Sequence, residues 1–384
     1  MKKSVNKELV YFDIEEDLIN KYPECKYYVV YGERSNGKTF SSLCLAIKEF
    51  IHNHSQSAYV RRFEDDIKTN KIKDLFKAIV EKGKVHELTN GKYNSVVCRE
   101  KKLYLAFKNG DKVEVANDPF LIPFAISLEE HYKSLSYPLI NTIILDEFIT
   151  RNYELPDEFV KFTSILSTII RERDNVKIIM LANSISMYKT TYFRSMGLNR
   201  VKDQKKNTID TYQTKTEDGR NLYIACMYVD FVDKKGKRQV KPSDVYFAFD
   251  NPKMKMITSG EWEYSFYPLL PYKYEYKEII YRYYIKYEDD ILQCEIIKHK
   301  NEKSGEYEVF TYIHRKTTEI KEFPNELIFS TEYNPSNRYR RKINRPLTKG
   351  EERLYRFFKA DKVFYQNNII GEIVRAYLNF CYQN

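Results

Sequence analysis

Apolar residues in the first 200 positions follow two alternating patterns. Short, almost wholly apolar runs are typical of buried parallel strands. They occur at 27–31, 57–60, 142–145 and 176–182. Longer stretches carry apolar residues at helical spacing. These lie at 40–51, 67–82 and 155–171, and further strand-like segments lie at 95–99, 101–107, 112–116 and 121–127. The alternation predicts an α/β fold with a mostly parallel sheet that helices cover on both faces.

The pattern changes after residue 200. Residues 201–220 are charged and loop-like, and 222–262 suggest short strands. A tyrosine-rich stretch with two prolines then leads into strand-like segments at 278–300 and 306–316, followed by helical segments near 349–360 and 368–382. We therefore expect a first domain over 1–200, a small linker or lid subdomain over 201–274, and an α+β domain over 275–384.

Composition narrows the class of protein. The chain has 384 residues, 42% hydrophobic and 31% charged, with a net charge of +10, so a polyanionic partner is suggested. No apolar run approaches the roughly 20 residues of a membrane span. The N-terminus lacks a signal-peptide core and the six cysteines are scattered, so we expect no membrane and a reducing cytoplasm. The 34 tyrosines could stack on bases, but strand formation is the favoured interpretation.

A glycine loop joins the first predicted strand to the first helix. It has the P-loop pattern G-x-x-x-x-G-K-[ST], in which backbone N–H groups surround phosphate oxygens. The loop and the next residue are Gly32, Glu33, Arg34, Ser35, Asn36, Gly37, Lys38, Thr39 and Phe40. Lys38 would reach the β- and γ-phosphates and the Thr39 hydroxyl would sit on Mg²⁺. The pattern predicts a nucleoside triphosphate site, with a chance match in a glycine turn as the alternative.

Two carboxylates end a later apolar run. Asp146 and Glu147 follow 142–145, so a buried strand would deliver both to the edge where α/β sheets bind ligands. Asp146 suits the Mg²⁺ shell and Glu147 could polarise an attacking water, as in a Walker B element. Asn183 ends the next predicted strand. It either senses the γ-phosphate or merely caps a turn.

The combination of these motifs resembles one family. The segments VVYGERSNGKTF, AYVRRFEDD, KSLSYPLINTIILDEFI, STIIRERDNVKIIMLANSIS and DKVFYQNNIIGEIV are similar to those of the DNA-packaging ATPases of small tailed phages of the phi-29 type. The similarity is good over about 27–195 and thin afterwards. It implies an ASCE, RecA-like P-loop ATPase that uses ATP and Mg²⁺, followed by an RNase H-like C-terminal domain.

The resemblance also implies roles for basic residues. Arg171 matches the family's candidate arginine finger, which acts on a neighbouring subunit, although Arg173 is close enough to be the finger instead. Lys133 matches a basic residue thought to act across the same interface. Arg171 could equally be a solvated helix end. Arg61 and Arg62 could bind phosphate or stabilise the sheet edge.

The C-terminal domain is expected to have lost cleavage and kept binding. Its first strand, 279–287, carries no acid, and Glu288, Asp289 and Asp290 fall in a turn that we interpret as a solvated hairpin tip. The densest basic stretch suits a phosphate backbone, with a solubilising loop as the alternative. Its basic residues are Arg338, Arg340, Arg341, Lys342 and Arg345.

These expectations combine into an ATP-driven double-stranded DNA translocase that packages a viral genome. The resemblance implies a homo-oligomeric ring of five subunits, with the portal of the prohead and in some cases a structural RNA as partners. Another nucleic-acid motor, such as a helicase or plasmid-transfer ATPase, is the first alternative. The second is a nucleotide-switched binding protein without turnover, against which Glu147 argues, because such a switch needs no water-positioning acid.

Overall fold

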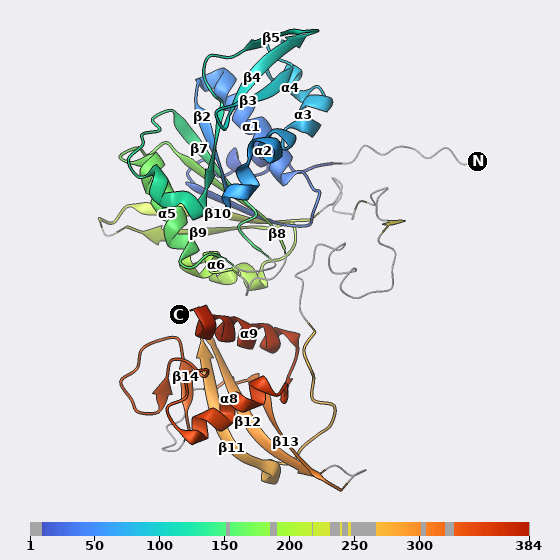
Figure 1. Ribbon diagram of the computed structural model, residues 1–384, viewed down its shortest axis with the longest axis vertical. Helices are drawn as coiled ribbons and strands as arrows, with labels where there is room; N and C mark the ends of the chain where they lie inside the picture. Colours follow the sequence, from blue (N-terminus) through green and yellow to red (C-terminus); the bar gives the residue numbers. More distant parts are fainter. Residues whose placement is uncertain are drawn as a thin grey trace, which may run out of the picture. The chain divides into compact units, whose positions relative to one another are not determined.

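The computed structural model describes residues 10–150, 154–184, 190–216, 218–230, 239, 245–246, 266–300, 305–318 and 326–383. The chain divides into two compact units, Met1–Glu263 and Tyr264–Asn384. Each unit is built around its own β-sheet, coloured blue to yellow-green in the first and orange to red in the second (Figure 1).

The first unit contains a ten-stranded sheet in the order β3-β4-β6-β2-β7-β8-β1-β10-β9, with β5 paired to β4. Six neighbouring strands, from β6 to β10, are parallel, which confirms the predicted mostly parallel sheet. The strands are β1 (Tyr27–Gly32), β2 (Gln56–Arg61), β3 (Ser95–Arg99), β4 (Lys102–Asn109), β5 (Lys112–Val115), β6 (Leu121–Ala125), β7 (Ile140–Asp146), β8 (Lys177–Asn183), β9 (Ile209–Lys215) and β10 (Asn221–Val229).

Short and long helices surround this sheet. They are α1 (Lys38–Asn53), α2 (Thr69–Asp74), α3 (Lys77–Glu81), α4 (Lys84–Leu88), α5 (Glu158–Ile170) and α6 (Tyr192–Ser195), with the shorter turns η1 (Glu15–Ile19), η2 (Glu64–Ile67), η3 (Ile126–Tyr132) and η5 (Asn199–Asp203). The helical spacing at 67–82 corresponds to η2, α2 and α3, not to one helix, although Ile72, Phe76 and Ile79 are all buried as the spacing predicts.

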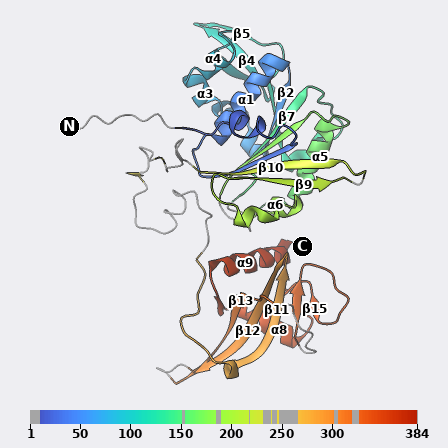
Figure 2. The same ribbon diagram turned by 180° about the vertical axis from the view of Figure 1, so that it is seen from behind.

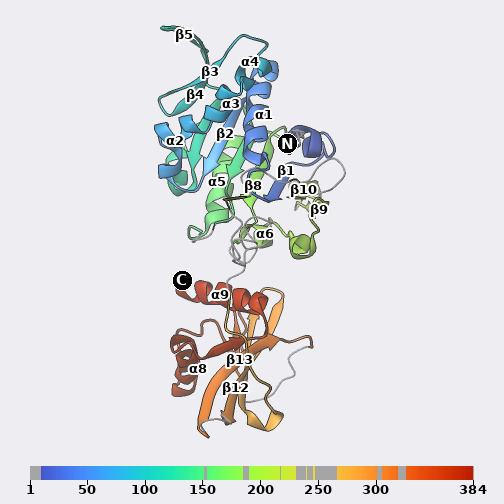
Figure 3. The same ribbon diagram turned by 90° about the vertical axis from the view of Figure 1, so that its right-hand side faces the viewer.

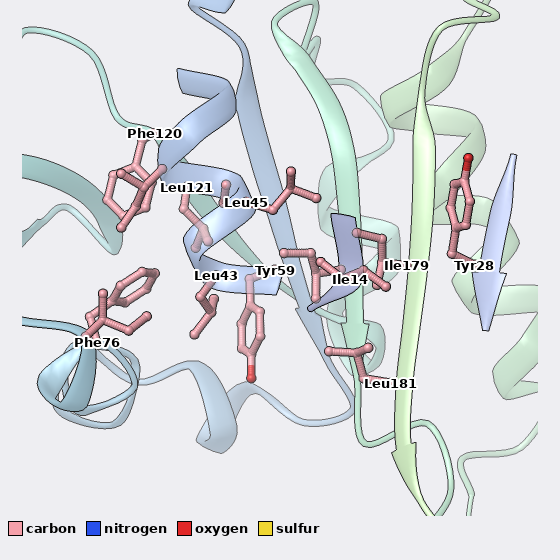
Figure 4. Close-up of a cluster of buried hydrophobic side chains, with 14 of the residues drawn as sticks. Ile14, Tyr28, Leu43, Leu45, Tyr59, Phe76, Phe120, Leu121, Ile179 and Leu181 are labelled. Atoms are coloured by element: carbon pink, nitrogen blue, oxygen red, sulfur yellow. The ribbon is translucent and has the colours of Figure 1, made fainter. Parts of the chain in front are cut away.

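The central strands are buried because helices cover both faces. Tyr28 of β1 and Tyr59 of β2 belong to the same hydrophobic cluster as Leu43 and Leu45 of α1. Figure 4 shows this cluster, with the Tyr59 hydroxyl pointing away from Leu45. On the other face, the ring of Tyr31 meets that of Phe193 in α6 at a centroid distance of 5.6 Å.

The first unit extends further along the chain than predicted. β10 pairs in parallel with β1, and β9 pairs antiparallel with β10, so both strands complete the first sheet (Figure 2). The boundary expected at residue 200 is therefore wrong, because backbone pairing with residues 27–32 fixes residues 221–229 in this sheet. Most of the rest of the expected linker, 231–265, lies outside the described residues.

The second unit contains a six-stranded sheet in the order β15-β14-β11-β12-β13-β16. β11, β12 and β13 form the predicted antiparallel meander, while β14 pairs in parallel with β11 and β16 with β13. Helix α9 packs against β11, β13 and β16 (Figure 3). The elements are η7 (Tyr276–Glu278), β11 (Ile279–Tyr287), β12 (Asp290–Lys300), β13 (Tyr307–Arg315), β14 (Ile328–Ser330), β15 (Tyr339–Arg340), α8 (Lys349–Lys359), β16 (Val363–Tyr365) and α9 (Asn368–Gln383).

One side chain of the expected hairpin tip is not solvated. Glu288 and Asp289 form the turn between β11 and β12, with Glu288 at a φ of 55°. Asp290 instead begins β12, is buried, and pairs with Arg315 of β13. The prediction was wrong for Asp290 because the cross-strand arginine, not visible as a partner in the sequence, neutralises it.

Candidate functional site

The two glycines of the P-loop occupy positions that only glycine fits. Gly32 ends β1 with a φ of 145°, and a Cβ there would lie 1.9 Å from the carbonyl oxygen of Val229. Gly37 precedes α1 with a φ of 100°, and its Cβ would lie 3.2 Å from Tyr11 Cβ and Phe12 O. Positive φ and close backbone contact both exclude a side chain, so the strand–loop–helix geometry of the motif is present as predicted.

The side chains of the loop point in two directions. Arg34 and Ser35 are exposed, whereas Glu33, Asn36 and Lys38 are buried. Lys38 Nζ donates to Glu33 O at 2.6 Å and to Asn36 Oδ1 at 3.1 Å. Asn36 Nδ2 is buried and has no hydrogen-bond partner within the described part of the chain. Such a donor, beside the ammonium and the start of α1, fits an approaching phosphate oxygen.

Thr39 and Asp146 meet although 107 residues separate them in sequence. Thr39 Oγ1 donates to Asp146 Oδ2 at 2.9 Å, and the Tyr59 hydroxyl donates to the same oxygen at 2.9 Å. Burial, and then the nearby Asp146 charge, hold the pKa of Tyr59 well above its usual value, so the hydroxyl stays protonated as a donor. A hydroxyl and a carboxylate are the oxygen ligands that Mg²⁺ prefers. The residues present therefore fit the expected metal.

Glu147 is held by an arginine of the neighbouring strand. Its φ is +59°, a left-handed conformation that is uncommon for a non-glycine residue. Its carboxylate is 55% exposed and pairs with Arg61 at 2.6 Å. Arg62, the next residue, is buried and pairs with Glu158 at the start of α5. Arg61 therefore contacts the candidate catalytic carboxylate, and Arg62 contacts an internal one.

Asn183 lies at the same edge as these groups. It is opposite Gly32 in the register of β8 and β1, and Leu181 of β8 is opposite Asp146 of β7. The carboxyl ends of three neighbouring parallel strands therefore bring the P-loop, Asp146 and Asn183 together. β8 lies between β1 and β7, as expected for the ASCE class.

Arg171 and Lys133 lie elsewhere in the unit. Arg171 follows α5, is exposed, and its Nη2 donates to Leu135 O at 2.7 Å. Lys133 is half-exposed and pairs with Glu130 at 2.5 Å. Arg173 binds the segment just before and at the start of β7, through Pro138 O at 3.0 Å and Asn141 Oδ1 at 2.8 Å.

These contacts place Arg173, with Arg171 nearby, at the opposite edge of the sheet. Asn141 is the second residue of β7 and Asp146 the last, so a strand rise of about 3.3 Å per residue separates them by roughly 16 Å. The structure does not bring Arg171 or Lys133 to the nucleotide loop of the same chain. It also separates the two arginines, since Arg173 is committed to four intramolecular acceptors.

The basic stretch of the second unit divides into internal and exposed residues. Arg340 Nε donates to the buried Glu351 of α8 at 2.9 Å, so this arginine makes an internal ion pair. Arg341 and Lys342 lie over the ring of Phe380, at 5.5 and 5.9 Å. Arg341 and Arg345 are exposed. Arg338 is half-buried.

Glu295 of β12 is a residue that the sequence did not single out. Burial alone would raise its pKa, but contacts from His314, Tyr274 and Gln293 outweigh burial and lower the pKa to about 2. Arg282 of β11 donates to it at 3.3 Å. This carboxylate is therefore enclosed by donors.

Among the described residues, no group of three or more His, Cys, Asp or Glu side chains is placed to hold a metal.

A family model described as Podovirus DNA encapsidation protein (Gp16) matches residues 6–222. The chain belongs to this family. Within the described residues, no helix is both long and apolar enough to cross a membrane. The match covers the P-loop, both carboxylates, Asn183 and the two candidate basic residues, and it ends inside β10.

Individual relatives agree with this assignment. The chain is 29% identical over 181 residues to the DNA packaging protein of Bacillus phage phi29, covering 46% of this chain and 47% of that protein. It is 31% identical over 173 residues to the DNA packaging protein of Bacillus phage B103, covering 44% and 47%. The chain thus matches about half the length of these curated relatives.

Two solved structures share the fold over nearly the whole chain. The bacteriophage Phi-29 viral genome packaging motor assembly gives a TM-score of 0.54 at 15% identity, covering 96% of this chain and 99% of that chain. The Phi-28 gp11 DNA packaging motor gives 0.50 at 17% identity, covering 98% and 99%. At these identities the likeness shows the fold alone, and it supports the RecA-like assignment.

Proposed function

We propose that the protein is an ATP-hydrolysing motor that moves double-stranded DNA into a viral prohead. The observation that carries this proposal is the convergence of the P-loop, the Thr39–Asp146 pair and Glu147 at one edge of the sheet, in a chain of the DNA encapsidation family. The curated relatives are named as DNA packaging proteins. Their name supports DNA as the substrate that is moved.

Each residue at the carboxyl edge of the parallel strands would have its own role in hydrolysis. The loop N–H groups, Lys38 and Asn36 would bind the triphosphate, and Thr39 and Asp146 would hold Mg²⁺, which neutralises phosphate charge when bound. Tyr59 orients the Asp146 carboxylate through its hydrogen bond. Glu147 orients the attacking water once its carboxylate leaves Arg61. Asn183, opposite Gly32, is placed to contact the γ-phosphate.

The basic residues would act in trans. Because Arg171 lies away from the nucleotide edge of its own chain, it would reach a nucleotide only in a neighbouring subunit, and the family resemblance implies the same for Lys133. Contacts between two different edges of identical subunits are heterologous, and they form a ring where the rotation between subunits closes. Hydrolysis then depends on assembly, since the transition-state charge is stabilised by an arginine of the neighbour. Family resemblance suggests five subunits.

The exposed basic residues of the second unit would contact the DNA backbone. Arg341 and Lys342 present cations next to the Phe380 ring, and Arg345 is exposed. Contacts of such cations with phosphates are independent of sequence. The portal of the prohead and, in part of the family, a structural RNA would be the other partners. The motor would work in the cytoplasm of the infected host cell.

Steady-state ATP hydrolysis tests this proposal. We expect duplex DNA to stimulate the wild type, and Glu147→Gln to lower kcat by about 100-fold or more while ATP binding survives. Glu87→Gln, at an exposed carboxylate of α4 that pairs with Lys84, is the matched control. Stimulation by single strands only would favour a helicase, and absence of turnover in the presence of duplex and prohead would favour a nucleotide switch.

A further inference from the structure

A buried ion pair joins the residue that follows β2 to the first residue of α5. Nε and Nη2 of Arg62 donate to the two carboxylate oxygens of Glu158, at 2.6 and 2.8 Å. The Glu158 side chain is fully buried and that of Arg62 is 9% exposed. A bidentate pair of this kind fixes direction as well as distance, so Arg62 and Glu158 hold β2 and α5 in one relative orientation.

The remaining hydrogen bonds of Arg62 fix the main chain beside the candidate catalytic carboxylate. Nη1 donates to Glu147 O at 3.3 Å and Nη2 to Phe148 O at 2.9 Å. Glu147 has the left-handed φ described above. A backbone in such a conformation persists only where its surroundings determine it, and Arg62 supplies two of those contacts from a different strand.

Glu158 is equally well connected on the helix side. It is the first residue of α5, and its carboxylate also accepts from Leu155 N at 2.7 Å and from the Tyr192 hydroxyl at 3.1 Å. The other end of α5 leads directly to Arg171. A helix of 13 residues is about 20 Å long and moves as a stiff rod. One stiff element therefore connects the Glu147 turn to the arginine at the opposite edge of the sheet.

We propose that Arg62 is a positioning residue that fixes the Glu147 turn and the start of α5 as one unit. The state of a subunit's own nucleotide site then sets the position of the arginine that the same subunit presents to its neighbour. This inference rests on the proposed function, because it assumes that Arg171 acts in trans. It adds a route by which the nucleotide sites of a ring would hydrolyse ATP one after another.

The first test separates positioning from folding. Arg62→Lys keeps a cation beside Glu158 but cannot donate to Glu158 and to both carbonyls at once. We expect kcat for ATP to fall about 10-fold or more, with the Kd for ATP and the Tm close to wild type. Glu158→Gln is the second variant if Arg62→Lys does not fold. Arg200→Lys, at an arginine that contacts Thr211 and Tyr212 of β9, is the matched control. Wild-type kcat in Arg62→Lys would overturn the inference.

The second test uses mixed rings. Glu147→Gln and Arg171→Ala should each be inactive alone. When they are mixed, an Arg171→Ala subunit keeps its Glu147 and receives an intact arginine from a Glu147→Gln neighbour, so hydrolysis returns. Replacing Glu147→Gln by Arg62→Lys in the mixture tells whether an Arg62→Lys subunit still donates a well-placed arginine.

The outcomes of the mixing experiment distinguish the coupling through Arg62 from the trans action of Arg171. The inference predicts that Arg62→Lys restores less than about a third of the activity that Glu147→Gln restores, after subtraction of the unmixed rates. Equal restoration would show that Arg62 affects only its own site and would overturn the coupling. Failure of the Glu147→Gln reference mixture would instead contradict the trans arginine of the proposed function, and the inference would fall with it.

Discussion

At the residue scale, two hydroxyls donate to one carboxylate oxygen. Thr39 and Tyr59 both bind Asp146 Oδ2, while Asp146 Oδ1 accepts from Glu147 N. A carboxylate with both oxygens engaged has a fixed orientation. The Thr39 hydroxyl and Asp146 are the proposed Mg²⁺ ligands, so Tyr59 would act on a bound metal through Asp146. Groups of this kind tune metal affinity strongly.

Removal of the Tyr59 hydroxyl should therefore weaken the binding of Mg²⁺ without weakening that of the nucleotide. Tyr59→Phe keeps the buried ring and loses only the hydrogen bond to Asp146. We expect the Mg²⁺ concentration for half-maximal hydrolysis to rise about 10-fold, with metal-free nucleotide binding unchanged. Tyr28→Phe, in β1 of the same sheet, is the control, since the Tyr28 hydroxyl donates to Tyr22 O away from Asp146. An unchanged Mg²⁺ titration in Tyr59→Phe would contradict the assigned role.

The same site shows what a single sequence can predict. Gly32, Gly37, Lys38 and Thr39 were predictable because the spacing of the P-loop dictates their geometry. Tyr59 was not, since a tyrosine within an apolar strand resembles an ordinary core residue. Its one signal is the position two residues before Arg61, on the same face of β2.

At the element scale, the sequence pattern predicted individual strands but not which strands pair with one another. The strand predicted at 279–287 has the same bounds as β11, because its apolar run is closed by an acidic turn. In contrast, nothing local indicates that residue 224 lies opposite residue 27 in neighbouring parallel strands. The charged segment at 201–220 suggested a domain boundary there, but the pairing of β10 with β1 overrides that local signal.

The partners of individual arginines were unpredictable for the same reason. Whether Arg61 or Arg62 reaches Glu147 depends on the register between β2 and β7, in which Val60 lies opposite Leu145. Register is a property of the assembled sheet. Likewise, Arg340 was grouped with its basic neighbours. Its partner Glu351 lies 11 residues further along the chain, and nothing in the sequence indicates that the two side chains meet.

The second sheet offers a prediction about pH. Glu295 has a pKa lowered from 4.5 to about 2. Its stabilising contribution is therefore complete above about pH 4.5 and is lost as the pH falls towards 2. A shift of this size corresponds to about 3 kcal/mol. Hydrogen exchange, corrected for intrinsic rates, should show the opening free energy of β12 falling from pH 5 to pH 3.

Substitution of Glu295 separates this effect from general acid destabilisation. Glu295→Gln should lower the opening free energy of β12 at pH 5 and remove most of its dependence on pH. Glu332→Gln is the control, because Glu332 is 60% exposed in its pair with Lys286 and such surface pairs contribute little. An equally steep pH dependence in Glu295→Gln would show that other groups govern acid unfolding of β12.

At the scale of the whole molecule, one sheet presents two different functional edges. The P-loop, Asp146 and Glu147 lie at the carboxyl ends of the parallel strands, while Arg173 marks the amino end of β7 and Arg171 lies nearby. Under the proposed function, a monomer would hold an incomplete hydrolytic site. Completion by a neighbour would link hydrolysis to the ring, and the α5 connection proposed above would link one site to the next.

Displacement of a triplex-forming strand from duplex DNA is the most direct test of the central claim. A motor that moves along intact duplex strips the third strand and leaves the two others paired. With proheads and ATP present, the account predicts displacement by the wild type and none by Glu147→Gln. Separation of the duplex itself, or ATP hydrolysis without any displacement, would contradict a double-stranded DNA translocase.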